Sequence, residues 1–405
     1  MSRWLKNVRL ETGESRHSDG TVKTETELFN IEISEDGVIQ TLVPSLEHTE
    51  TDGMDMGGRL ALPPFKEMHN HLDKTYLSLG FRACRPVKNL SERLKLEAAE
   101  LETLAETVEQ RASAMIELHL KNGVNHIRTH VNIDPFIKLK NLEGVKRALE
   151  SYKEYLTYEI VAFPQHGLLL HEEMPDLLRE ALQSGAGILG GLDPAGIDGN
   201  VEKSLEMTME IAKEYGVDVD MHFHDRGHIG YYTMDRWLDM VSAEDYQGKT
   251  TFSHAFGLSQ LQPGVQQNFA RKLKQYDVSI MSTIPISVNH KVIPIDILKE
   301  NGVAVGLGCD GFYDSWSPFV SGDIMEKVNH FCDYTGKSTE RVLRNSLGLI
   351  TGGITPLDDK GNQQWPKPGD EASFVFTDVS CSAEAVARLP EDRQLMHRGI
   401  LFNKD

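Results

Sequence analysis

Short apolar segments alternate with longer amphipathic segments along most of this chain, and no other feature restricts its fold as much. Eight short segments are rich in β-branched or small apolar residues, and most end in Gly, Pro, Asp or Asn, as strands do. These predicted strands cover residues 60–71, 126–133, 159–166, 187–192, 218–224, 250–256, 278–284 and 303–309. Amphipathic helices with apolar residues at i, i+3 and i+4 are predicted between strands, as at 90–121, 170–183, 201–215 and 262–276.

Eight strands that alternate with helices predict an α/β fold in which a parallel sheet closes into a (β/α)8 barrel of the TIM type. The structural alternative is a doubly wound open sheet. Many such sheets carry a Gly-rich phosphate-binding loop after the first strand, and no such loop follows residues 60–71. We therefore expect a barrel with its active site at the carboxyl ends of the strands.

The two ends of the chain show a different pattern. Short stretches there have the alternation of strands and are separated by polar turns, at 28–33, 38–43 and 372–378. Residues 1–59 and 355–405 are therefore predicted to form a small β-sandwich domain together. The barrel is predicted to occupy residues 60–354.

Composition restricts the class of protein. Of the 405 residues, 40% are hydrophobic and 25% are charged, which excludes intrinsic disorder. The net charge of −19 argues against nucleic acid or an anionic membrane as a partner. Four widely spaced cysteines without a CxxC pair indicate a reducing compartment. The chain shows neither a signal peptide nor an apolar run of membrane-spanning length, so we expect a soluble, cytoplasmic protein.

The strongest functional signal is a pair of histidines, His69 and His71, at the end of the first predicted barrel strand. Residues i and i+2 of a strand point to the same face, so both imidazoles would face the mouth of the barrel. Two imidazoles directed at one point suit a transition-metal ion. The alternative for an isolated pair is two surface histidines in a loop.

Polar residues also stand at the ends of three other predicted strands. They are His222 and His224 after the fifth strand, His254 after the sixth and Asp310 after the eighth. Each of them alone could be a structural histidine of the core or a helix-capping aspartate. Because four strands carry polar groups at the same end, their burial would be costly unless something bound them. We interpret the set as a metal site.

The order of these residues along the strands resembles that of the amidohydrolase superfamily over the whole chain. The sequence motifs at residues 128–131, 161–167 and 310–318 resemble those of the cytosine deaminase group. The strings His-x-His-x-Asp-Lys at 69–74 and His-x-His-Asp at 222–225 resemble the branch that contains N-isopropylammelide isopropylaminohydrolase.

The resemblance implies one bound divalent metal ion. Imidazole-rich sites favour zinc, with iron as the alternative. The implied ligands are His69, His71, His222 and Asp310. Dinuclear relatives bridge their metals with a lysine on the fourth strand, and residues 187–193 contain no lysine. A single ion is therefore expected.

The resemblance also implies roles for residues around the metal. His254 would lie beside the bound water, and Gln165 would reach the substrate ring. Lys74, which would otherwise be a surface charge, would contact a carbonyl or an anionic oxygen of the substrate. Trp316 would offer a flat wall, although aromatic residues near a barrel more often belong to the core. His224 would either bind the substrate or support the ligands.

The expected chemistry is hydrolytic. A bound divalent ion lowers the pKa of a water, from which Asp310 would accept a hydrogen bond while His254 orients it. A departing amine needs a proton donor. Asp225 stands where cytosine deaminases carry a glutamate, and its alternative role is to cap a helix. The predicted catalytic residues are Asp225, His254 and Asp310.

These residues predict an enzyme that removes an amine from a small nitrogen heterocycle of the pyrimidine or s-triazine type. Gly311 and Asp225 both depart from the cytosine deaminase pattern, so the reaction class is better supported than cytosine as substrate. Ring opening of a cyclic amide at the same site is an alternative, and so is a non-catalytic scaffold with this fold. Relatives are often oligomers, so a homo-oligomer is one of the states that the sequence allows.

Overall fold

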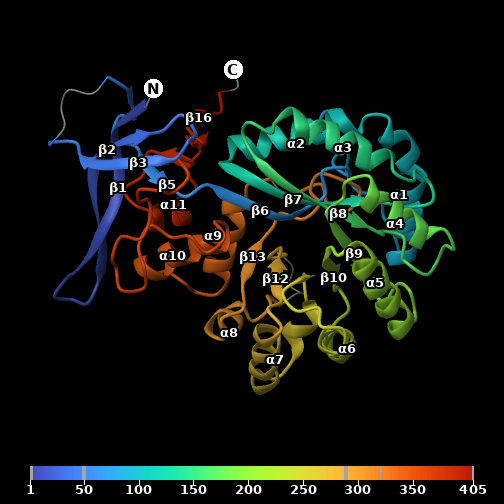
Figure 1. The fold of residues 1–405 in the computed structure, drawn as a ribbon. Helices are drawn as coiled ribbons and strands as arrows, with labels where there is room; N and C mark the ends of the chain where they lie inside the picture. The colour runs from blue at the N-terminus through green and yellow to red at the C-terminus, as the bar shows by residue number, and fades with distance from the viewer. Residues whose placement is uncertain (1–2, 48–51, 287–290, 320, 404–405) are drawn as a thin grey trace.

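The computed structural model describes residues 3–47, 52–286, 291–319 and 321–403. Its centre is a barrel of eight parallel strands that follow one another in chain order (Figure 1). The strands are β6 (Phe65–Asn70), β7 (Val124–Asn132), β8 (Thr157–Phe163), β9 (Ile188–Leu192), β10 (Asp218–His222), β11 (Thr250–Ser253), β12 (Ser279–Ser282) and β13 (Val305–Leu307). The backbone N–H of Asp310 donates to the carbonyl of His69 at 2.8 Å and joins the last strand to the first. The predicted (β/α)8 barrel is confirmed.

Helices connect these strands and cover the outside of the barrel (Figure 1). Those before β13 are α1 (Leu90–Ala105), α2 (Val108–Lys121), α3 (Lys140–Ser151), α4 (Met174–Gln183), α5 (Val201–Tyr215), α6 (Gly227–Ala243), α7 (Pro263–Gln275) and α8 (Ile295–Glu300). Those after it are α9 (Ile324–Tyr334), α10 (Glu340–Ser346) and α11 (Ser382–Arg388). The apolar faces of helices and strands share one large core that includes Phe223, Trp237 and Phe252.

Strands from both ends of the chain form a second sheet beside the barrel. They are β1 (Arg3–Arg16), β2 (Val22–Ile33), β3 (Ile39–Pro44), β4 (Met54–Asp55), β5 (Leu60–Leu62), β14 (Phe374–Thr377), β15 (Gln394–His397) and β16 (Ile400–Leu401). Their order is β16-β15-β14-β5-β1-β2-β3, and β4 pairs with β1. A small core around Ile31, Trp365 and Phe374 is separate from that of the barrel. The small β unit agrees with the prediction, while domain boundaries at residues 59 and 355 stay a prediction.

Residues 60–71, expected as one strand, are divided between the two sheets. Leu60–Leu62 (β5) pairs with β1 and β14 in the terminal sheet, whereas β6 is the first strand of the barrel. Pro63 and Pro64 stand between them. Because proline has no N–H to donate, it does not continue a central strand. The two prolines therefore carry the chain from one sheet to the other, directly before the strand that bears His69.

Residues 90–121, expected as one helix, form two helices because Arg111 binds the end of α1. Its Nη2 donates to the carbonyl of Leu104 at 2.7 Å, and its Nη1 donates to the carbonyls of Asp73 at 2.8 Å and Thr75 at 2.6 Å. The guanidinium is fully buried. Arg111, near this break, thus also holds the loop that follows His71 in place.

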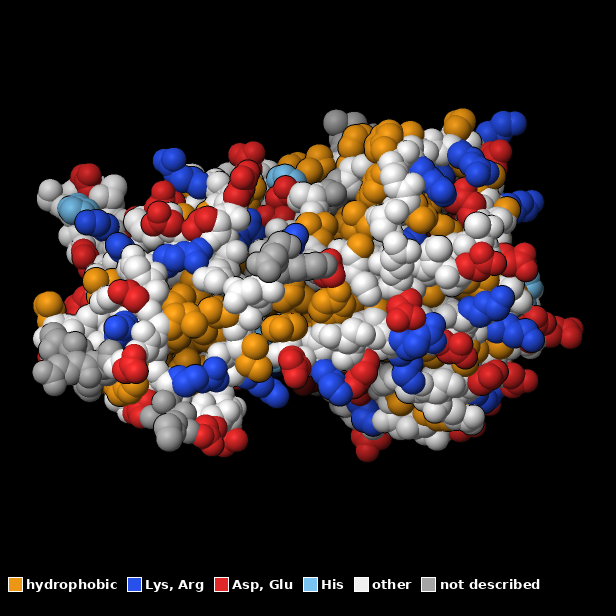
Figure 2. Space-filling model, turned by 90° about the horizontal axis from the view of Figure 1, so that it is seen from above, with side chains coloured by type: hydrophobic (Ala, Val, Ile, Leu, Met, Phe, Trp, Pro, Cys, Tyr) orange, Lys and Arg blue, Asp and Glu red, His pale blue; other side chains and the backbone are white. Residues whose placement is uncertain are grey.

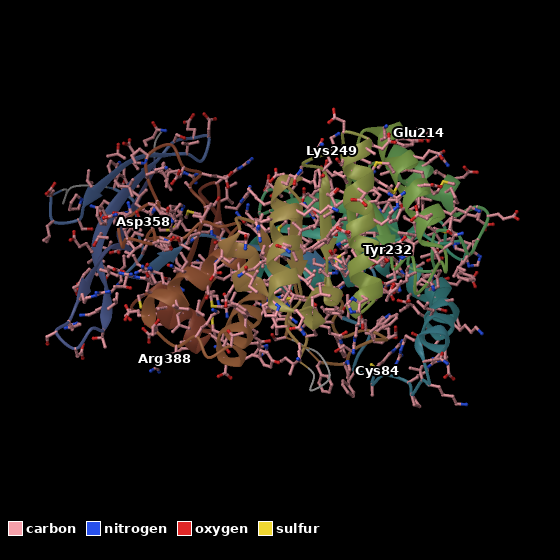
Figure 3. The ribbon with its side chains drawn as sticks, turned by 90° about the horizontal axis from the view of Figure 1, so that it is seen from below. Cys84, Glu214, Tyr232, Lys249, Asp358 and Arg388 are labelled. Atoms are coloured by element: carbon pink, nitrogen blue, oxygen red, sulfur yellow. The ribbon has the colours of Figure 1, made fainter. Side chains whose placement is uncertain are left out.

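The two ends of the barrel are marked by labelled residues in Figure 3. Lys249 stands directly before β11 and lies at the amino-terminal end of the strands. Cys84 lies at the opposite end, where its thiol is 3.8 Å from the carbonyl oxygen of Asp314. The polar residues predicted at strand ends all belong to the end marked by Cys84.

The surface carries mixed charge. Basic and acidic side chains are interspersed over the face shown in Figure 2, and hydrophobic side chains gather near its middle. All four cysteines are free thiols, which agrees with the expectation of no disulfide framework. Among the described residues, no helix combines the length and apolar character needed to cross a bilayer.

Candidate metal centre and active site

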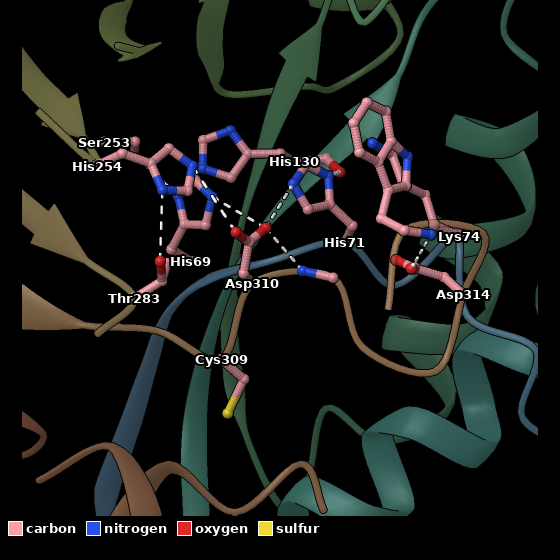
Figure 4. A network of polar contacts seen from close by, with 12 residues as sticks. His69, His71, Lys74, His130, Ser253, His254, Thr283, Cys309, Asp310 and Asp314 are labelled. Atoms are coloured by element: carbon pink, nitrogen blue, oxygen red, sulfur yellow. Dashed lines mark hydrogen bonds and ion pairs between the residues drawn. The ribbon is translucent and has the colours of Figure 1, made fainter. Parts of the chain in front are cut away.

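The four predicted ligands meet at the carboxyl end of the barrel. His69 lies on β6, His71 follows that strand, His222 ends β10 and Asp310 follows β13. Asp310 Oδ1 lies 3.4 Å from His71 Nε2 and 3.8 Å from His69 Nε2. The ring centroid of His222 lies 4.6 Å from that of His69. Figure 4 shows His69 and His71 on either side of Asp310.

The hydrogen bonds of the two β6 histidines leave one nitrogen of each ring for a metal. His71 Nδ1 lies 3.0 Å from the carbonyl oxygen of His130, which only accepts, so Nδ1 carries the proton. His69 Nδ1 lies 2.8 Å from Ser253 Oγ. In both rings the remaining nitrogen, Nε2, is the one near Asp310.

Burial keeps the imidazoles of His69, His222 and His254 neutral. It lowers the pKa of His69 to about 3 and the pKa values of His222 and His254 well below 6.5. Within the part of the chain that the structure describes, the Nε2 atoms of all three are buried without a hydrogen-bond partner. Buried polar atoms rarely lack a partner, and neutral imidazole is a common metal ligand. The residues therefore fit a divalent metal ion.

Asp310 and His254 have backbone conformations that are uncommon for residues other than glycine. Their φ angles are 66° and 65°, and such residues cost about 1–3 kcal/mol each and cluster at functional sites. They bring Asp310 Oδ2 to 3.9 Å from His254 Nε2. The carboxylate of Asp310 is therefore placed beside the imidazoles of His254 and His71.

A cavity of about 200 Å³ opens beside these residues. Its wall is formed by His71, Lys74, Phe163, Gln165, Leu192, His222, His224, Asp310, Gly311, Asp314, Trp316 and Ser317. Cavities of about 600 Å³ and 940 Å³ elsewhere contain none of the predicted site residues. The structure thus brings all four residues predicted to bind substrate to one small cavity with three of the four predicted ligands.

Lys74 is buried in the wall of this cavity. Its Nζ donates to Oε1 of Gln165 and lies 3.5 Å from Oε1 of Glu97. The same atom lies 5.4 Å from the ring centroid of Phe163 and 5.8 Å from that of Trp316. Since Lys74 is only 8% exposed, the alternative of a solvent-facing lysine is excluded. An ammonium is therefore fixed in the wall of this cavity.

His224 borders the cavity and pairs with Asp193, the residue after β9. Asp193 Oδ2 lies 2.8 Å from His224 Nδ1, and Asp193 Oδ1 accepts from the backbone N–H of His224 at 2.6 Å. Burial would lower the pKa of His224, but the charge and hydrogen bond of Asp193 outweigh it and raise that pKa above 6.5. The pair holds the imidazole in one orientation at the cavity wall.

Asp225 is not among the residues that line the cavity. Its Oδ2 accepts from the backbone N–H of Gly196 at 3.0 Å. A side chain at position 196 would lie 2.5 Å from Asp225 Oδ1, so glycine permits this close approach. The carboxylate therefore lies against the loop after β9, and its role in proton transfer stays a prediction.

Sequence reasoning missed four residues of the site, namely Glu97, His130, Asp193 and Asp314. Asp193 and His130 stand near the ends of the fourth and second barrel strands, so the rule that found the ligands applies to them too. Asp314 lines the cavity, and burial raises its pKa to about 7. Glu97 reaches the site from α1. Neither Glu97 nor Asp314 follows a strand directly, and no local pattern indicates them.

A comparison with protein families identifies the family to which the chain belongs. The model of the amidohydrolase family (Amidohydro_3) matches residues 169–395, which is more than half of the chain. The chain belongs to the amidohydrolase family. Amidohydrolases typically depend on a divalent metal, and the His and Asp cluster of this chain offers ligands for one.

Individual proteins resemble the chain over most of its length. Protein YahJ of Escherichia coli (strain K12), whose function is uncharacterized, is 39% identical over 98% of this chain and 87% of its own. The N-isopropylammelide isopropyl amidohydrolase of Pseudomonas sp. (strain ADP) is 31% identical over 74% of each chain. The structure of N-isopropylammelide isopropylaminohydrolase from Burkholderia multivorans ATCC 17616 has a TM-score of 0.85 and 29% identity, covering 99% of this chain and 98% of that one.

These relatives confirm the predicted branch of the family. The chain is accordingly a hydrolase that acts on carbon–nitrogen bonds other than peptide bonds. The expectation of an enzyme is confirmed, and the alternative of a non-catalytic scaffold is set aside.

Proposed function

We propose that the protein is a mononuclear metal-dependent aminohydrolase that removes an amine from a nitrogen heterocycle of the pyrimidine or s-triazine type. One observation carries the proposal: neutral imidazoles, a charged carboxylate and a fixed ammonium converge on a single cavity of about 200 Å³. The named function of the Pseudomonas and Burkholderia relatives supports an s-triazine or a similar ring.

His69, His71, His222 and Asp310 would hold the metal, through Nε2 of His69 and His71 and a carboxylate oxygen of Asp310. We propose zinc, because imidazole-rich sites suit it, with iron as the alternative. When bound, a divalent ion supplies Lewis acidity and lowers the pKa of a water. Asp310 would accept a hydrogen bond from such a water, and His254, held close to Asp310 Oδ2, would orient it.

Lys74 and Gln165 bind the ring. The ammonium of Lys74 complements a carbonyl or an anionic ring oxygen, and the carboxamide of Gln165 matches a neighbouring donor or acceptor. The aromatic faces of Phe163 and Trp316, both near Lys74 Nζ, provide flat apolar walls for a heterocycle. Asp314, on the same wall, has an Oδ2 without a hydrogen-bond partner among the described residues and adds a polar contact.

The leaving amine needs a proton, since an amide anion is a poor leaving group. Asp225, the residue expected for this task, is turned toward Gly196. His224 borders the cavity, and its pairing with Asp193 leaves the Nε2 side of the ring for the substrate. We therefore propose His224 as the group that protonates the amine, with Asp225 as the alternative after a side-chain rotation.

The experiment that tests the function is product analysis of the metal-loaded protein. Pyrimidines, aminated and N-alkylated s-triazines, pterins and creatinine-like rings are supplied, and ammonia, alkylamine and carboxylate are measured. Amine release without a new carboxylate supports the proposal. A new carboxylate with the ring opened would replace it by the cyclic amide alternative. Absence of any product, together with no stoichiometric metal by elemental analysis, would reject it.

A further inference from the structure

A chain of polar groups crosses the interior of the barrel and ends on a predicted metal ligand. It begins at Glu159 on β8, whose Oε2 accepts from Arg128 Nε at 2.8 Å. Arg128 Nη1 donates to Asp220 Oδ2 at 3.1 Å. Ser253 Oγ donates to Asp220 Oδ1 at 2.6 Å and lies 2.8 Å from His69 Nδ1. Asp220, Ser253 and His69 are all fully buried.

The directions of these hydrogen bonds decide which nitrogen of His69 carries its proton. The hydroxyl of Ser253 has a single proton, and Asp220 receives it. Ser253 Oγ can then only accept from His69 Nδ1, so His69 is protonated at Nδ1 and bare at Nε2. This is the nitrogen that lies 3.8 Å from Asp310 Oδ1.

The side chain of Asp220 is itself held in place by Arg128. Its Oδ2 lies 3.1 Å from Nη1 of Arg128, which pairs the buried carboxylate with a guanidinium. Arg128 Nη1 additionally donates to Thr251 Oγ1 at 3.1 Å, so the guanidinium is held from two strands. Because β10 and β11 lie across the barrel from β6, the chain connects His69 to the far wall.

We infer that Ser253, held by Asp220 and Arg128, is a positioning residue that keeps the His69 ring in the Nδ1-protonated form, with Nε2 directed to the metal. The inference rests on the proposed function only in taking His69 as a ligand. Groups that orient a ligating histidine are commonly carboxylates or carbonyls, and their loss costs 10- to 100-fold in metal affinity or activity. Here a hydroxyl is inserted between the carboxylate and the imidazole.

The test is the zinc affinity of purified protein, measured by competition with a chelating dye. Ser253→Ala is expected to weaken zinc binding by about 10- to 100-fold, because His69 loses the acceptor that selects its tautomer. Ser253→Thr retains a hydroxyl and is expected to restore affinity to within a few-fold. Ser282→Ala is the matched control, since Ser282 is a buried serine that ends the neighbouring strand β12. Its zinc affinity is expected to equal that of the wild type.

A spectroscopic measurement separates positioning from general destabilisation. The cobalt(II)-loaded wild type and Ser253→Thr should share one visible absorption spectrum, whereas Ser253→Ala should show a shifted one at saturating metal. Equal zinc affinity and an unchanged cobalt spectrum in Ser253→Ala would overturn the inference. Absence of metal binding by the wild type would instead reject the proposed function, so the two failures are distinguishable.

Discussion

Lys74 Nζ lies 3.5 Å from Oε1 of Glu97, and both side chains are at most 7% exposed. The lysine that faces the cavity is therefore one half of a buried ion pair between the segment after β6 and helix α1. Glu97 Oε1 also accepts from Trp316 Nε1 at 3.1 Å. One carboxylate thus positions both a cation and an aromatic wall of the cavity.

Lys74→Met is expected to raise KM by at least about tenfold, because the variant loses the ammonium that we propose contacts the substrate. It is also expected to lower the free energy of unfolding by roughly 3–5 kcal/mol, because the variant leaves Glu97 as an unpaired buried charge. Steady-state kinetics and denaturant unfolding measure the two effects.

The double variant Lys74→Met, Glu97→Gln separates these effects. Removing both charges together should recover most of the lost stability, because no unpaired charge remains, while KM stays high. Recovery of KM in the double variant would mean that Lys74 acts only by neutralising Glu97.

His224→Gln is expected to lower kcat by roughly 10²- to 10⁴-fold, the usual share of general acid–base catalysis, while the protein keeps its metal. Asp225→Asn is expected to cost much less, because an asparagine oxygen can still accept from the N–H of Gly196. Both variants are compared at matched metal content, measured by elemental analysis. A larger loss in Asp225→Asn than in His224→Gln would return the proton transfer to Asp225.

Removal of the metal is expected to destabilise the fold as well as abolish activity. A ligand that binds only the folded state stabilises it by RT ln(1 + [L]/Kd), which is about 4 kcal/mol at a free concentration 1,000 times Kd. Dialysis against a chelator should therefore lower Tm by several degrees, and added zinc should restore it. A Tm that does not respond to chelator or zinc would contradict a metal bound between strands β6, β10 and β13.

Asp314 predicts a pH dependence of stability. Burial raises its pKa to about 7 from 3.8, with Lys74 the largest opposing influence. Between about pH 4 and pH 7 the folded protein holds a proton that the unfolded chain has released, so this group makes stability fall as pH rises through that window. A shift of about three units corresponds to about 4 kcal/mol at most.

Asp314→Asn should remove this dependence. Asn can keep the acceptor oxygen that binds the N–H groups of Trp316 and Ser317 at 2.8 Å and 3.0 Å. The variant should gain stability over the wild type at pH 8 and show little gain at pH 4, as measured by urea unfolding at the two values. An equal difference at both pH values would place the pKa of Asp314 near that of an ordinary aspartate.

The barrel was predictable because hydrophobic residues recur with different periods in its strands and helices. Tertiary contacts did not override this overall pattern. Helix α5 begins and ends at the predicted residues, with Asn200 accepting from Lys203 N at its start and Gly216 at its end. The break between α1 and α2 was not predictable, since Arg111 stabilises it through carbonyls of a distant loop. The Pro63-Pro64 pair was visible in the sequence, and its effect on residues 60–71 could have been predicted.

The convergence of the predicted ligands could be predicted because a strand end fixes the direction of its side chains. Glu97 could not be predicted, since it reaches Lys74 from a helix whose placement depends on packing. The orientation of Asp225 follows from the loop after β9, where Gly196 lets the carboxylate approach the backbone. Side chains that follow a strand by several residues thus depend on loops whose conformations carry no periodic signal.

Strand β5 occupies the middle of the terminal sheet, where Leu60 pairs with Arg9 of β1 and with Thr377 of β14. During synthesis the amino-terminal strands leave the ribosome first, so this half of the sheet waits with an open edge until the whole barrel has been translated. An unpaired edge is a template for aggregation. Chains that stop before residue 374 are therefore expected to be insoluble, although every predicted ligand of the metal has already been made.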